Sequence, residues 1–160
     1  MNFIGIDPGK KGGIACLNDA GDLVFFSPMP CRADGFLDIR TAANSLLELR
    51  PGHIALERAQ AFPKQGLVST GRYLEDFGKL LAVAELFWQL KYRHYPRPQT
   101  WKTILTAGTD KTAAVAFVAA HHPEATLILP RKRKPHDGVA DAICIAHWCR
   151  LTHSTTAGSL

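Results

Sequence analysis

The sequence predicts an α/β protein built on a mixed five-stranded sheet, with three antiparallel N-terminal strands, then strand–helix units, and helices flanking the sheet. Three short apolar runs follow one another at the start, separated only by turn residues. Two further short apolar runs alternate with longer segments of helical periodicity. The length of 160 residues suits one domain. We expect that domain over residues 1–151 and a disordered tail over 152–160.

The first strand covers residues 2–7 and ends in Asp7, where the turn "PGKKGG" begins. Strands over 13–18 and 23–27 follow, joined by the hairpin signal "NDAGD". Helical spacing over 38–49 predicts a helix that stops at "RPG". The run "HIALE" then predicts a fourth strand that ends at Glu57.

The second half of the chain is mostly helical in pattern. We expect a loop over 58–70, then a long helix over 71–90 with Ser69 or Thr70 as its cap. The segment "YRHYPR" predicts a fifth strand, and Pro98 suits the start of a short helix over "PQTWKTIL". Two more helices are expected over 110–121, capped by Thr109 or Asp110, and over 137–151.

Bulk properties indicate a compartment and a class of partner. The net charge of +5 favours a polyanionic partner, although a modest positive charge is often only surface. The four cysteines form no C-x-x-C pair, so we expect free thiols in a reducing, cytoplasmic protein. We see no signal-peptide pattern and no apolar run of membrane-spanning length, and therefore expect no membrane association.

Four carboxylates stand where solvent exposure does not readily explain them: Asp7, Glu57, Asp137 and Asp141. Each has a structural alternative. Asp7 can serve the Asp-Pro-Gly turn, and Glu57 can face water at a strand end. Asp137 can cap the last helix, with Asp141 in its favourable first turns.

Together the four carboxylates predict a metal site. Asp137 and Asp141 lie four residues apart and share one helix face. Four carboxylates at one point would raise one another's pKa values unless a cation neutralised them. Oxygen ligands select Mg²⁺, with Mn²⁺ as a substitute. Two such ions can clamp the attacking and leaving oxygens of a phosphodiester.

Several stretches resemble one family. "IGIDPG", "ALE", "WKTIL", "DKTAAV" and "HDGVADAICIA" are similar, in order and spacing, to motifs of the RuvC-type Holliday junction resolvases. The resemblance spans about residues 2–149 and implies an RNase H-like fold. It also implies a dimeric, metal-dependent endonuclease that nicks paired strands symmetrically across a four-way DNA junction, with two metal ions per active site.

The resemblance assigns roles by motif. It implies that Asp7, Glu57 and Asp141 are metal ligands, and that Lys102 and Lys111 hold DNA phosphate near the scissile bond. Phe62 falls in the loop where the family places an aromatic wedge. Asp137 lies four residues before Asp141, whereas the best-known bacterial members have an acid three residues before, and Phe62 lies further from the glutamate than their wedge does. Both departures suggest a phage-type or divergent member.

Basic side chains surround these motifs. The run Arg131, Lys132, Arg133 and Lys134 directly precedes the last helix, and we expect it to bind DNA, although such runs are often solvated loops. Lys64, Arg72 and Arg97 lie in or near loops expected at the same sheet end. Lys10 and Lys11 follow Asp7 and have the same two interpretations.

Other residues carry weaker expectations. Gly12 and Gly13 are expected to leave room for a DNA backbone. Trp101 is expected in the core. His136 has three interpretations, of which phosphate contact or no role ranks above metal ligation. The helix over 71–90 carries more apolar surface than one sheet face covers, which favours a homodimer. Alternatives to the resolvase remain a relaxed-specificity branched-DNA nuclease, and a non-catalytic or ATP-binding member of the RNase H-like and actin-like superfamily.

Overall fold

The computed structural model describes residues 1–60, 66–89, 92–105 and 112–154. The predictions made for Phe62, Lys64, Lys111, the caps Thr109 and Asp110, and tail residues 155–160 lie outside these residues. The strands are β1 (Asn2–Asp7), β2 (Gly13–Asn18), β3 (Leu23–Pro28), β4 (His53–Leu56) and β5 (Arg93–His94). The helices are α1 (Ile39–Glu48), α2 (Leu67–Phe87), α3 (Pro98–Trp101), the 3-10 helix η2 (Lys102–Ile104), α4 (Ala113–His121) and α5 (Asp137–His153).

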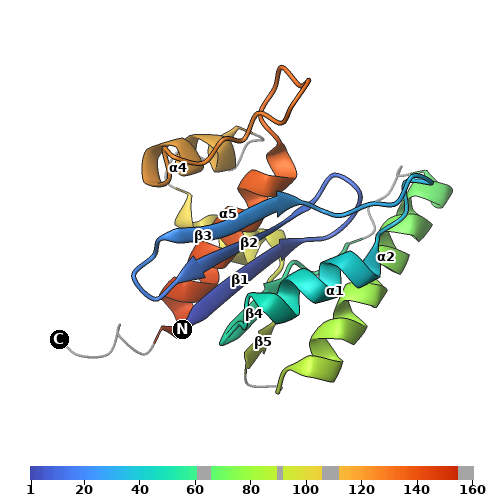
Figure 1. Cartoon of the computed structure of the whole chain (residues 1–160), viewed down its shortest axis with the longest axis horizontal. Coiled ribbons are helices and arrows are strands. Elements are labelled where there is room, and N and C mark those ends of the chain that lie inside the picture. Colours follow the sequence, from blue (N-terminus) through green and yellow to red (C-terminus); the bar gives the residue numbers. More distant parts are fainter. Residues whose placement is uncertain (61–65, 90–91, 106–111, 155–160) are drawn as a thin grey trace.

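The five strands form one mixed sheet in the order β3-β2-β1-β4-β5 (Figure 1). β1 pairs with β2 and β2 with β3 in antiparallel fashion, whereas β4 runs parallel to both β1 and β5. This is the predicted fold class. Parallel pairing of β1 with β4 brings the carboxyl ends of both strands to the same edge of the sheet.

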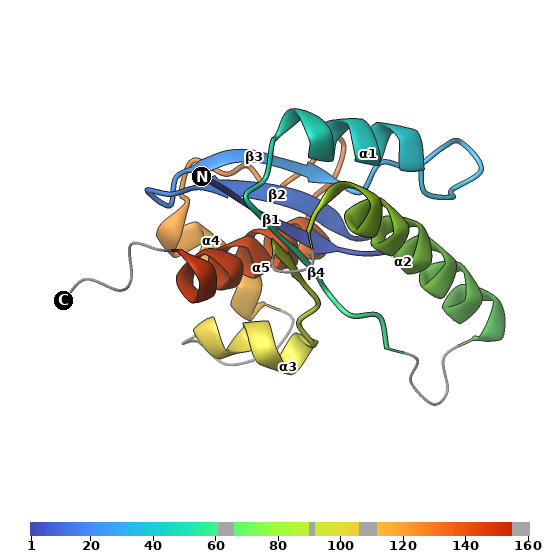
Figure 2. The same cartoon turned by 90° about the horizontal axis from the view of Figure 1, so that it is seen from below.

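Helices cover both faces of the sheet, α1 and α2 on one and α3, α4 and α5 on the other (Figure 2). Alternate residues of β1 serve the two cores, since Phe3 faces the α4–α5 side and Ile4 the α1–α2 side. α5 lies directly over β1, where a Cβ atom on Gly5 would stand 2.2 Å from the carbonyl oxygen of Ala142. Gly5 therefore lets the helix that carries two of the predicted carboxylates rest against the strand that carries a third.

Several element boundaries differ from the predictions. α2 begins at Leu67 rather than 71 and is capped by Gly66, not by Ser69 or Thr70; the Ser69 hydroxyl donates instead to the Gly66 carbonyl. The two apolar residues of its first turn do not extend the buried face of the helix, since Leu67 is 89% exposed and Val68 is 71% exposed. α2 ends at Phe87 rather than at 90.

The fifth strand, predicted over 92–97, is only Arg93–His94. Pro96 has no N–H to donate to a neighbouring strand. α4 begins at Ala113 rather than at 110. α5 continues to His153, so Thr152 and His153 are helical and not part of a disordered tail. His153 is held there by stacking on His53 and His94.

All four cysteines are free thiols, as expected, with Cys31 exposed and the other three buried. Over the described ranges, no helix combines the length and apolar character that crossing a bilayer requires.

Candidate active site

Asp7 is the last residue of β1, opposite Gly13 of β2. The chain turns at once, because Gly9 adopts a φ of +94° and the Gly12 N–H donates to the Gly9 carbonyl at 2.9 Å. The strand ladder fixes the Asp7 backbone, and the tight turn follows it directly. The turn interpretation and the site interpretation of this stretch are therefore compatible.

Three glycines shape this turn: Gly12 makes room within it, and Gly13 and Gly138 let it pack against the start of α5. A Cβ atom on Gly12 would stand 1.9 Å from the Asp7 carbonyl oxygen, and one on Gly138 would stand 2.0 Å from the Lys11 carbonyl oxygen. A Cβ atom on Gly13 would meet the Gly138 carbonyl oxygen at 2.9 Å. Gly12 and Gly13 thus make room for the protein's own backbone.

Glu57 directly follows β4, and its N–H donates to the Ile6 carbonyl at 2.9 Å, which continues the ladder with β1. Its side chain is oriented by Trp101, whose indole N–H donates to Glu57 Oε2 at 2.6 Å. Trp101 is fully buried, so the prediction that it packs in the core is confirmed. Its bond to Glu57 is an additional contact that the sequence did not reveal.

Asp137 and Asp141 lie in the first turns of α5. The N-cap is His136, whose Nδ1 accepts from the Val139 N–H at 3.2 Å, so Asp137 is not the capping residue. The expectations of phosphate contact or no role missed this function of His136. With capping supplied by the imidazole, Asp137 and Asp141 are free of that task and line one open cleft with Asp7.

Burial and mutual repulsion perturb the carboxylates at this sheet end. Burial raises the pKa of Asp7 well above its usual range, and the charges of Glu57 and Asp141 raise it further. The pKa of Glu57 rises to about 7, chiefly by burial, against the hydrogen bond from Trp101. The pKa of Asp141 rises to about 6, again chiefly by burial, and Asp137 adds to the rise. The four side chains are thus electrostatic neighbours.

Lys102, the first residue of η2, is the cation of this group. Its charge lowers the pKa values of Asp7, Glu57 and Asp141, which places it within electrostatic reach of all three. One ammonium does not neutralise this cluster of acids. Across the described ranges, the carboxylates do not gather into a group of three with all ligand atoms within 4.8 Å; three histidines elsewhere do.

Tyr73 of α2 is a neighbour that sequence reasoning missed. Its ring lies against Gly9, where a Cβ atom would stand 2.9 Å from the ring, and it lines the cleft beside Asp7. Burial, followed by the charges of Glu57 and Asp7, raises the pKa of its phenol. No motif marks Tyr73, because it lies mid-helix and far from either acid in the chain.

The predicted basic residues fall around the cleft. Lys10 and Lys11 are exposed and line it together with Asp7. Arg72 borders an adjoining hollow, with its guanidinium carbon 4.7 Å from the centre of the Phe36 ring. Residues 131–134 are exposed in the loop that leads into α5. This loop projects from the body of the protein (Figure 1). Arg97 instead lines a separate groove beside His94 and His153.

The sheet order, strand directions and flanking helices define an RNase H-like α/β fold of the RuvC type. A structure of T. thermophilus RuvC in complex with a Holliday junction substrate matches with a TM-score of 0.64 and 20% identity, covering 92% of this chain and 91% of that chain. A second Thermus thermophilus RuvC structure matches with a TM-score of 0.60 and 21% identity over 92% of each chain. No protein-family model matches the chain, and no curated protein matches its sequence.

Proposed function

We propose that this protein is a divalent-metal-dependent endonuclease that resolves four-way DNA junctions by paired, symmetric nicking. The observation that carries the proposal is the convergence of Asp7, Glu57 and Asp141 with Lys102 at one sheet edge of a RuvC-type fold. A buried anionic cluster of this kind is costly to fold, and a functional requirement for the charges accounts for that cost.

The residues present fit a pair of hard cations. Raised pKa values indicate that the carboxylates lack sufficient positive charge, and their oxygens are the ligands that Mg²⁺ and Mn²⁺ prefer. Asp7, Glu57, Asp137 and Asp141 would hold the ions. Bound there, two ions would supply an activated water and stabilise the departing 3′-oxygen.

The protein's own groups would orient the metal-binding carboxylates and stabilise the charge that develops on the DNA. The strand ladder holds Asp7 and the backbone of Glu57, and the Trp101 indole fixes one Glu57 oxygen. Lys102, and Lys111 by its motif, would offset charge that develops on the scissile phosphate. No covalent enzyme intermediate is needed.

Basic side chains supply the DNA contacts in this proposal. Lys10 and Lys11 line the cleft itself, and Arg72 lines the adjoining hollow. The exposed run from Arg131 to Lys134 would bind phosphates of an arm leaving the site. Phe62 and Lys64 complete the proposed DNA-binding set.

We also propose a homodimer, because paired nicking requires two sites. α2 keeps several large apolar side chains exposed, including Leu86 at 78% and Phe87 at 52%. Exposed apolar residues gathered along one helix are typical of a subunit interface.

The direct test is cleavage of a labelled four-way junction with Mg²⁺ and no ATP. We expect two symmetric nicks, no cleavage by Asp7→Asn, and retained junction binding by that variant. Forks, flaps and linear duplex run in parallel. Equal rates on all branched substrates would favour the relaxed-specificity nuclease, which the position of Asp137 four residues before Asp141 also favours. ATP turnover without nicking would contradict the nuclease assignment.

A further inference from the structure

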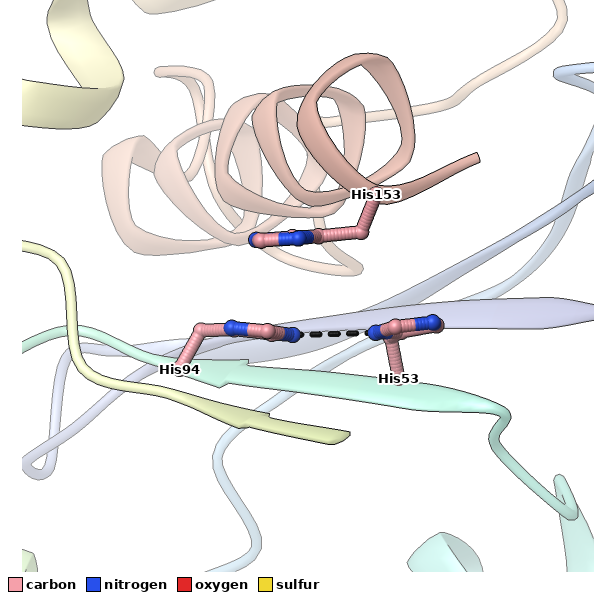
Figure 3. Close-up of side chains that lie close together, drawn as sticks. All are labelled: His53, His94 and His153. Atoms are coloured by element: carbon pink, nitrogen blue, oxygen red, sulfur yellow. Dashed lines mark hydrogen bonds between the residues drawn. The ribbon is translucent and has the colours of Figure 1, made fainter. Parts of the chain in front are cut away.

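Three histidines from three elements meet at the opposite end of the sheet from the carboxylates (Figure 3). His53 opens β4, His94 ends β5 and His153 ends α5. One ligand nitrogen of each lies within 4.8 Å of those of the other two. The closest approach joins His53 Nδ1 and His94 Nε2, which stand 2.9 Å apart.

The three rings form a layered arrangement. His94 and His153 are stacked, with ring centres 3.6 Å apart and planes inclined by 11°. His53 is nearly parallel to His153 as well, with centres 5.4 Å apart. In Figure 3 the ring of His153 descends from the helix onto the pair that rises from the two strands.

The surroundings keep the imidazoles neutral. Burial, followed by His153 and His53, lowers the pKa of His94 to about 4. Burial is also the leading cause that lowers the pKa values of His53 and His153. A neutral imidazole carries a ring nitrogen with a free lone pair, the form that binds a metal.

One of these nitrogens lacks a partner. Nε2 of His153 is buried and has no hydrogen bond to any group in the described part of the chain. A buried polar atom without a partner destabilises the folded state. A cation at this point would pair with it.

We propose that His53, His94 and His153 bind one transition-metal ion of the Zn²⁺ type, which ties β4, β5 and the end of α5 together. Imidazole nitrogen suits Zn²⁺, Cu²⁺ and Ni²⁺, whereas Mg²⁺ and Mn²⁺ prefer oxygen. The protein would thus hold chemically different metals at the two ends of its sheet.

The geometry needs only local adjustment. Two nitrogens bound to a tetrahedral Zn²⁺ stand roughly 3.3 Å apart, slightly more than the 2.9 Å between His53 and His94. The His53 and His94 nitrogens face each other in a hydrogen bond, and the His94 and His153 rings are stacked. Because imidazole lone pairs lie in the ring plane, all three rings must turn to direct a nitrogen at one ion. His94 and His153 also line a groove with Arg58, Arg93 and Arg97, from which water or an anion would supply the fourth ligand.

The histidine site is remote from the carboxylates. His53 precedes Glu57 by four strand positions, which is about 13 Å. Asp141 precedes His153 by twelve helical positions, which is about 18 Å. A ligand change at the histidines therefore leaves the carboxylate end of the sheet in place.

The first test measures Zn²⁺ binding to the chelator-treated chain, free of any histidine tag, with Mg²⁺ in excess. We expect one Zn²⁺ per chain and a higher melting temperature on binding. His94→Gln and His153→Gln should each weaken binding at least tenfold. The matched control is His121→Gln, because His121 is exposed and its Nδ1 contacts the Phe117 carbonyl instead. Absent binding, or equal affinity in all three variants, would overturn the proposal.

The second test identifies a ligand directly and does not depend on stability. Co²⁺ bound to the wild type should give the visible spectrum of a nitrogen-ligated ion. His153→Cys should bind Co²⁺ and add a sulfur-to-cobalt charge-transfer band, because the thiolate would replace the imidazole. Far-ultraviolet circular dichroism checks that each variant is folded. A folded His153→Cys variant that binds Co²⁺ without this band would exclude His153 as a ligand.

Discussion

The indole nitrogen of Trp101 lies 2.6 Å from Oε2 of Glu57, so a fully buried aromatic side chain orients a carboxylate of the proposed site. Trp101 donates this bond from the end of α3, and Glu57 receives it just beyond β4. The position of the Glu57 carboxylate therefore depends on the packing of a core residue.

Trp101→Phe removes this donor while keeping most of the apolar volume. We expect cleavage to slow by about 10–100-fold, because outer-shell partners of metal ligands typically contribute that much. Higher Mg²⁺ concentrations should recover part of the rate. A metal titration of the single-turnover rate measures both effects. Trp148→Phe is the control, since Trp148 packs beside His94 and His153 rather than Glu57; equal losses in both variants would point to general destabilisation.

Without divalent metal, stability should fall as pH rises. The folded pKa values of Glu57 (about 7) and Asp141 (about 6) exceed the ordinary values of 4.5 and 3.8. The folded state therefore binds more protons than the unfolded state between about pH 4 and pH 7, and its stability decreases across that window. Melting curves in EDTA measure this decrease. Mg²⁺ or Mn²⁺ should restore stability mainly above pH 6, and a flat metal-free profile would contradict the burial of these charges.

Asp7→Asn should separate stability from activity. The change removes a buried carboxylate whose pKa is raised by burial and by two acidic neighbours, and therefore removes the free-energy cost of ionising it in the folded state. We expect the metal-free variant to gain about 1–2 kcal/mol in unfolding free energy at pH 7. Urea titration in EDTA measures the gain, with Asp19→Asn on the exposed surface as the control. A variant that is destabilised and yet cuts normally would remove Asp7 from the site.

Replacing Arg131, Lys132, Arg133 and Lys134 by Ala should weaken DNA binding across all DNA shapes. The slope of log affinity against log salt should flatten by roughly one unit for each DNA phosphate that the variant no longer neutralises. Fluorescence anisotropy of the Asp7→Asn variant, with and without these changes, at several salt concentrations measures the slope without cleavage. An unchanged slope would assign the run to solvent.

Gly12→Ala should unfold the protein or destabilise it by several kcal/mol, because the new Cβ atom would stand 1.9 Å from the Asp7 carbonyl oxygen. Gly71→Ala and Gly78→Ala are matched controls in α2, where a Cβ atom meets nothing within 4 Å. Each should instead gain about 0.5–1 kcal/mol. Thermal melts of the three variants decide between a role in the turn and one in DNA approach.

The sequence predicts the sheet and α5 well because their signals are local. Three apolar runs with turn residues define β1 to β3, and one uninterrupted, largely apolar segment forms α5. The start of α2 gives no such signal, because Leu67 and Val68 are exposed. Because these two apolar residues are not buried, their positions do not indicate where the helix begins.

The site is predictable only in part. The acids that end β1 and β4, and the pair on α5, converge because strand direction and helix face follow from local pattern. Contacts made by single side chains across long separations leave no pattern. Trp101 with Glu57, Tyr73 with the acids, and the histidine cluster all belong to this class. The sequence does not reveal that the turn itself requires Gly12, because a turn glycine looks the same in sequence whichever neighbour needs the space.

The seam of Gly12, Gly13 and Gly138 also constrains how the protein can change over generations. A Cβ atom at Gly12 would meet backbone of its own turn, and one at Gly13 or Gly138 would meet backbone across the seam, so replacements there should be purged from a library of variants even under selection for folding alone. The basic loop nearby carries no such burden. Under the proposed function, overall DNA affinity could therefore change through the exposed side chains of residues 131–134, while the seam keeps Asp7 and Asp141 in register.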